Sequence, residues 1–317
     1  MPFGTQDITY LNGAWTYAAQ PASLEDIMVE WQLRQYFSLA LASLTNTQTL
    51  VWYTSFQDPK WANATVQDFL KTLTGFKHFK VNIRRGLSAD LSLEFVHDLT
   101  KLAVLGVSRR DRRAVQDQIA GIIAASPALH RLDIDTDPYP SRNDTLSLQQ
   151  DFLSRVPKEI ILPITRLNVR RLRVSFDDEI IRHFRSLKSF NICLKKISAS
   201  NARGLFHVIA RQRLAGDFYA RVLPKHCESL ENLELRPTMP SAWCFSDSLH
   251  HHFEPCQRLK ELAVTLNFSA SNIDDMSGLN MVKRTTSTLP LLERLTVYAI
   301  DNWDSVRELT PNSSITP

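Results

Sequence analysis

Glycine is scarce in this sequence, and no glycine-rich phosphate-binding pattern occurs in it. The 317 residues include only 9 glycines, and neither G-x-G-x-x-G nor a Walker-type loop is found. Such loops rely on glycine because a side chain would keep the backbone N–H groups away from the phosphates. The sequence therefore does not indicate a common type of nucleotide-binding enzyme.

Cysteine is also scarce, and long apolar runs are missing. The four cysteines form no C-x-x-C pair, which in so long a chain is typical of a reduced, intracellular protein, cytoplasmic or nuclear. No charged-then-apolar leader opens the chain, and the run at residues 36–44 is too short to span a bilayer. We therefore expect no membrane partner.

Motifs of catalysis are missing as well. The sequence has no G-x-S-x-G nucleophile elbow and no H-E-x-x-H zinc motif. The three histidines at 250–252 attract attention as metal ligands, but consecutive helical residues point about 100° apart and do not converge on one ion. We predict a protein that is not an enzyme, with no catalytic, cofactor-binding or metal-binding residues. An enzyme whose site is assembled from distant segments, without a recognisable motif, remains the alternative.

A short apolar pattern, L-x-x-L-x-[VIL], recurs along the chain. It is clear at residues 129–134, 230–235, 259–264 and 292–297, and the alternation at its end is typical of a β-strand. Weaker versions raise the number of expected strands to nine, with anchors 18 to 43 residues apart and about 31 on average. The anchors, each the second apolar residue of its pattern, are Leu50, Phe79, Leu102, Leu132, Leu172, Phe190, Leu233, Leu262 and Leu295.

Helical segments are expected between these strands. The first begins after Ser23, which has capping-box spacing to Asp26, and it carries Leu24, Met28 and Trp31 near one face. The later ones are expected at residues 65–73, 91–99, 114–125, 147–156, 178–187, 198–214, 216–223, 247–259 and 276–288.

Units of one short strand and one helix cannot bury their apolar faces alone, but stacked units can. We therefore predict an α/β fold: an irregular leucine-rich-repeat-like solenoid with a curved parallel sheet and outer helices. The expected divisions are a lead-in with a capping helix at 1–43, about nine irregular units at 44–300, and a tail or incomplete last unit at 301–317. An ordinary α/β fold with a parallel sheet is the alternative.

The four clear units resemble leucine-rich repeats, and their uneven length resembles the repeat region of F-box proteins, particularly the divergent fungal ones. The resemblance covers roughly residues 44–300. An F-box itself is not evident, since its nearest match, Val-Pro-Lys-Glu-Ile-Ile at 156–161, is interpreted as a helix end followed by a strand. The resemblance implies substrate recognition for a cullin–RING ubiquitin ligase, through a Skp-type adaptor if an F-box lies upstream.

The residues that flank the anchors should line the concave face of such a stack, because strand side chains alternate. They are basic in the early and middle units and acidic later, and interfaces favour tyrosine and arginine. The predicted partner-binding residues are Tyr53, His78, Lys80, Lys101, Arg131, Asp133, Arg171, Arg173, Asn232, Glu234, Glu261, Arg294 and Tyr298.

A face of mixed charge with aromatic ends favours a protein partner. We predict a non-enzymatic interaction scaffold that is a monomer outside its complex. The alternative is a nucleic-acid or phosphate-binding module that uses residues 159–225, which hold 14 basic and 5 acidic side chains, against 7 and 12 in residues 226–317. No aromatic residues are interleaved with its basic clusters, so a nucleic acid is the less favoured partner.

Overall fold

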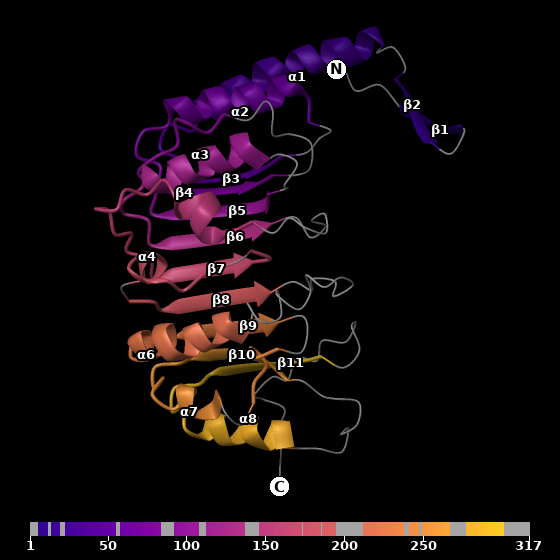
Figure 1. The fold of residues 1–317 in the computed structure, drawn as a ribbon. Coiled ribbons are helices and arrows are strands. Elements are labelled where there is room, and N and C mark those ends of the chain that lie inside the picture. The colour runs from indigo at the N-terminus through magenta and orange to yellow at the C-terminus, as the bar shows by residue number, and fades with distance from the viewer. Residues whose placement is uncertain are drawn as a thin grey trace.

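One nine-stranded parallel sheet with helices dominates the computed structural model of the chain (Figure 1). This confirms the α/β prediction. The structure describes residues 6–11, 14–19, 23–54, 58–83, 92–107, 112–136, 146–172, 174–184, 186–194, 212–237, 241–246, 249–266 and 277–300.

The strands of the large sheet stand in the order of the sequence, so each strand between the two edges pairs with the strand before it and the strand after it. A separate antiparallel hairpin, β1 (Gln6–Leu11) and β2 (Ala14–Ala19), precedes them. The strands of the large sheet are β3 (Thr49–Tyr53), β4 (His78–Asn82), β5 (Lys101–Val107), β6 (Arg131–Thr136), β7 (Arg166–Arg170), β8 (Ser189–Leu194), β9 (Asn232–Pro237), β10 (Glu261–Leu266) and β11 (Arg294–Ala299).

The apolar anchors lie side by side across the whole sheet. The register pairs Leu50, Phe79, Leu102, Leu132, Leu167, Phe190, Leu233, Leu262 and Leu295 in turn. Eight of these are the predicted anchors, and only the one in β7 differs. The residue three before the anchor is buried in most strands, for example Phe76, Leu99 and Ile164, so the same apolar spacing fills the core from one strand to the next.

The backbone repeats one arrangement at the start of every strand from β4 to β11. The carbonyl of Thr100, just before β5, accepts hydrogen bonds from the N–H groups of His130 and Arg131 at 3.0 and 3.2 Å. The carbonyls that do the same at the other steps belong to Gln48, Lys77, His130, Thr165, Lys188, Glu231 and Lys260. Each strand thus enters the sheet in the same way as its neighbours.

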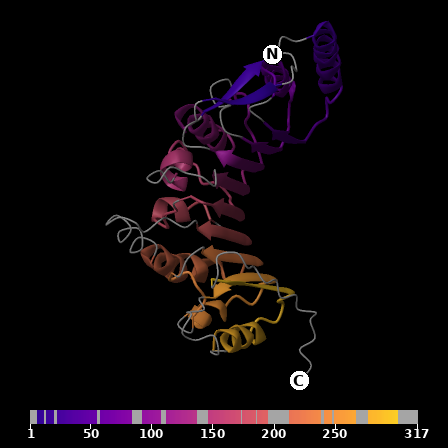
Figure 2. The same ribbon diagram turned by 90° about the vertical axis from the view of Figure 1, so that its right-hand side faces the viewer.

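The helices between the strands lie on one side of the sheet, as Figure 2 shows. The stack of strands is curved, and the helices lie on its convex side. The second and fourth residues of most strands point to this side and are buried. The helical elements there are α2 (Lys60–Thr72), α3 (Arg112–Ala124), α4 (Asp178–Ile181), α6 (Leu223–His226), α7 (His250–Phe253), α8 (Ser277–Ser287) and the π-helical turns η2 (Leu148–Leu153) and η3 (Phe218–Val222).

The first helix, α1 (Leu24–Ala42), begins where the sequence predicts. Ser23 accepts a hydrogen bond from the Asp26 N–H, and the Asp26 carboxylate accepts one from the Ser23 N–H, so the predicted capping box is confirmed. The apolar face of α1 is exposed: Leu24, Met28 and Trp31 are 81%, 64% and 63% accessible to solvent.

The strand predicted at residues 172–174 is wrong. Leu172 and Val174 are buried beyond the end of β7, whose anchor is Leu167. The pattern Leu172-x-Val174 has the same spacing as Leu167-x-Val169, and each is preceded three residues earlier by a buried apolar residue, Val169 and Ile164 respectively. Residues 156–161, interpreted as a helix end followed by a strand, contain no strand, since β7 begins only at Arg166.

Several predicted helices are shorter than expected. Residues 92–99 contain turns and no helix, α4 ends at Ile181, and α7 covers four residues. The segment expected to be helical at 198–214 lies mostly outside the described residues. In residues 92–99 the buried Leu93, Val96 and Leu99 fill the core from turns, which have no helical period for the sequence to display.

Candidate partner-binding face

One side of the sheet carries side chains rather than helices in the described part of the chain. We call it the open face: the first, third and fifth residues of β3–β11. All of them except Thr265 are half-buried or exposed. Because the strands are in register, these residues form three rows that cross the sheet from β3 to β11.

Eleven of the thirteen predicted partner-binding residues lie on the open face. The structure places there Tyr53, His78, Lys80, Lys101, Arg131, Asp133, Asn232, Glu234, Glu261, Arg294 and Tyr298. Tyr53 and Tyr298 stand at opposite ends of the sheet, in β3 and β11. Arg173 lies outside the described residues.

Arg171 is not a strand residue of the open face, which corrects its predicted position. It follows β7 with a φ of 63°, and its backbone N–H donates to the Cys193 carbonyl. Its guanidinium binds the Asp135 carboxylate, with Nε to Oδ1 at 2.9 Å, and both side chains are partly buried. Arg171 therefore ties the end of β7 to β6.

The residues that β7 does present are Arg166, Asn168 and Arg170, which the sequence analysis missed. Arg166 and Arg170 are exposed, and Arg170 donates to the Asn168 side chain at 3.4 Å. The alternation around Leu167 and Val169 predicts a strand there, but the equivalent pattern at Leu172 and Val174 predicts one as well.

Four basic residues stand in line at the first positions of β4–β7. We call His78, Lys101, Arg131 and Arg166 the cationic row, and the register places each opposite the next. Arg131 makes an ion pair with Asp133 at 2.8 Å on its own strand. Among the described residues, no ion-pair partner is found for Lys101 or Arg166.

The electrostatics of two histidines reflect this crowding of positive charge. Burial lowers the pKa of His78, and the charges of Lys101 and Arg131 lower it further. Burial likewise lowers the pKa of His130, which precedes Arg131, with Lys101 and Arg166 adding to the effect. An anion at this row would relieve the repulsion.

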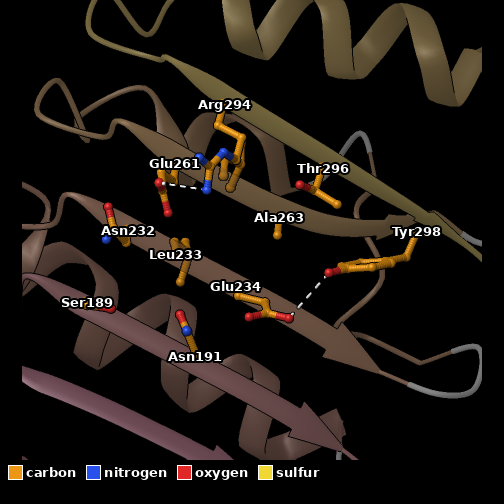
Figure 3. Close-up of a pocket in the computed structure, with 11 residues that line it drawn as sticks. Ser189, Asn191, Asn232, Leu233, Glu234, Glu261, Ala263, Arg294, Thr296 and Tyr298 are labelled. Carbon is orange, nitrogen blue, oxygen red and sulfur yellow. Dashed lines mark hydrogen bonds and ion pairs between the residues drawn. The ribbon is translucent and has the colours of Figure 1, made fainter. Parts of the chain in front are cut away.

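The other end of the open face holds a shallow pocket of about 170 Å³ over β8–β11, shown in Figure 3. The short side chain of Ala263 forms the bottom of the pocket, and the longer side chains of Glu234, Glu261 and Arg294 surround it. Its lining residues are Ser189, Asn191, Asn232, Leu233, Glu234, Glu261, Leu262, Ala263, Arg294, Thr296 and Tyr298.

Intramolecular contacts hold the pocket side chains in place. Arg294 pairs with Glu261 at 3.1 Å, and the Tyr298 hydroxyl lies 3.4 Å from a Glu234 oxygen. The Arg236 guanidinium lies 4.5 Å from the centre of the Tyr298 ring, a cation–π contact. Preorganised side chains of this kind lose little conformational entropy when a partner binds.

Neither the histidines at 250–252 nor the cysteines form a reactive centre in the structure. No group of three His, Cys, Asp or Glu residues close enough to hold a metal ion is found in the part of the chain that the structure describes. His252 stacks on Tyr219 instead. Burial raises the pKa of Cys193, and that of Cys256 to about 12, so both thiols stay protonated at neutral pH.

No protein-family model matches the chain, and a search of curated proteins found no significant match. In the described part of the chain, no helix combines the length and the apolarity needed to cross a membrane. The geometry of the open face is therefore the basis for a functional proposal.

Proposed function

We propose that the chain is a leucine-rich-repeat-like solenoid whose open face binds a protein partner, without catalysis. The observation that carries the proposal is the continuous register of the anchors from β3 to β11, with the same carbonyl arrangement at each step. A stack built from one repeated unit has one long face lined by variable side chains, which is the binding surface of solenoid proteins.

The composition of the open face supports a protein partner. It joins a cationic row, neutral amides and acidic residues with tyrosines at both ends. Such mixed polarity with aromatic anchors is typical of protein interfaces. The pocket over β8–β11 is shallow, so it suits a side chain of a partner better than a small substrate.

The alternative of a nucleic-acid module has less support. Several arginines of residues 159–225 already have partners within the chain: Arg171 binds Asp135, Arg221 binds Asp178, and Arg182 donates to backbone carbonyls. Fewer cations then remain to neutralise phosphates.

A quantitative pull-down tests the interaction proposal. A partner recovered with the wild-type chain should be lost from a Glu234→Arg/Tyr298→Ala variant, because these residues stand on the open face. It should be retained by Lys283→Glu, an exposed change on α8. Equal recovery by all three proteins would contradict the proposal.

A role in a ubiquitin ligase is proposed on the family resemblance alone. If it holds, the protein expressed in cells should co-purify with a Skp-type adaptor and a cullin. Recovery of a partner on the open face without either would remove the ligase role and leave the scaffold.

A further inference from the structure

We propose that the cationic row binds an acidic segment of the protein partner, an inference that rests on the proposed function of the open face. The four residues of the row lie on adjacent strands, so the row spans about 14 Å, or three strand spacings of about 4.8 Å. About four residues of an extended chain cover that length.

Two cations of the row, Lys101 and Arg166, have no ion-pair partner among the described residues. Arg131 is paired with Asp133 on its own strand. Lys101 and Arg166 lie on either side of that pair, in β5 and β7. Burial, and after it the charges of neighbouring cations, lower the pKa of His78 and His130, so an anion beside them would favour their protonated forms. A run of carboxylates laid across β4–β7 would pair with Lys101 and Arg166 and would favour the protonated form of His78.

The opposite end of the open face has no excess of positive charge, because Glu234 and Glu261 stand there with Arg236 and Arg294. Glu261 stands in the first position of β10, in the same row across the sheet, and Glu234 stands nearby in β9. The β4–β7 end is more positive, since its open-face lysines and arginines outnumber Asp133 and Asp135, and it therefore fits an acidic run better. This difference in charge would orient the partner along the sheet.

Fluorescence polarisation with a labelled peptide tests the inference. The probe is a short peptide whose core alternates aspartate and glutamate, and the control probe carries asparagine and glutamine instead. At low salt the wild-type chain should bind the acidic peptide and not its neutral control. The double variant Lys101→Glu/Arg166→Glu should bind the acidic peptide about tenfold more weakly or worse.

Two matched variants separate the row from general charge. Lys283→Glu/Arg284→Glu changes the net charge by the same amount on exposed positions of α8 and should leave the affinity within about twofold. Lys101→Gln/Arg166→Gln should weaken binding less than the double glutamate change. Far-UV circular dichroism and thermal unfolding check that each variant folds.

Three results would overturn the inference: no binding by the wild-type chain, equal losses in the row and α8 variants, or displacement of the peptide by a single-stranded oligonucleotide of equal charge. The last would indicate a nucleic-acid site. A partner that depends on Glu234 and Tyr298 but not on Lys101 and Arg166 would disprove the acidic-segment inference and leave the proposed function standing.

Discussion

Among the described glycines, Gly106 leaves the least room for a side chain. It has a φ of 75° at the irregularity in β5, and a Cβ added there would lie 2.4 Å from the Ile83 carbonyl oxygen. We expect Gly106→Ala to lower the free energy of unfolding by about 2–3 kcal/mol, because the backbone is strained and the close contact is with backbone. Urea denaturation measures this.

Gly121 in α3 provides the control for that change. A Cβ at this position meets nothing within 4 Å, and the backbone is helical. Gly121→Ala should raise stability by about 0.5–1 kcal/mol. Similar losses for both variants would contradict the account of Gly106.

His183 and His226 make stability depend on pH. Both are buried, and each Nδ1 accepts a hydrogen bond from a backbone N–H, of Leu162 and Leu187 respectively. Burial lowers the pKa of each to about 4, against 6.5 for an ordinary histidine. The unfolded chain therefore takes up more protons between these values, and stability is lost as the pH falls from about 6.5 towards 4.

Each of these histidines should lower the free energy of unfolding by about 2 kcal/mol at pH 5 relative to pH 7. Denaturation curves at the two pH values measure the loss. His183→Asn keeps an acceptor for the Leu162 N–H but does not titrate. The free energy of unfolding of this variant should therefore fall by about 2 kcal/mol less between pH 7 and pH 5 than that of the wild type. An unchanged loss in this variant would show that other groups cause it.

At the scale of elements, the bounds of β7 determine which arginine lies on the open face. Arg166 begins this strand on the open face, whereas Arg171 lies beyond its end and binds Asp135. Arg166→Ala should weaken binding of the acidic peptide without changing stability. Arg171→Ala should lower stability by about 1–2 kcal/mol and leave peptide affinity unchanged.

Equilibrium denaturation and peptide titration of both variants give the two readings. If Arg171→Ala weakened binding of the acidic peptide and Arg166→Ala did not, the register assigned to β7 would be wrong.

The strands were more predictable than the helices, for a physical reason. Leu230, Leu233 and Leu235 are all buried, so the sequence itself displays the period of β9. In β7 the apolar pair Leu167 and Val169 competes with Leu172 and Val174, which are equally apolar and also buried. Local pattern cannot choose between them, because the choice depends on hydrogen bonds to β6 and β8.

The candidate site was predictable only in part. Strand alternation places Lys101 and Glu234 on the open face, whereas the pocket depends on the short side chain of Ala263 between taller neighbours. The buried histidines were not predicted, since their acceptor role requires N–H groups brought from a preceding part of the chain.

The stability of the whole molecule should vary along the stack. A strand within the sheet is held by two neighbours, whereas β3 and β11 each have one. In β11 only Val297 is buried. Hydrogen exchange should therefore be slowest in β5–β9 and fastest in β3 and β11, because terminal units of a stack open first. Uniform protection across the strands, measured by mass spectrometry, would contradict a stack held by neighbour contacts.

The central claim is that a protein partner binds the open face, and site-specific photo-crosslinking tests it most directly. A photoreactive amino acid replaces Asn191 or Thr296 on the open face, or the exposed Glu254 or Lys283 on the helical side. The account predicts partner adducts from both open-face positions and none from the helical side. Adducts from the helical side alone would contradict it.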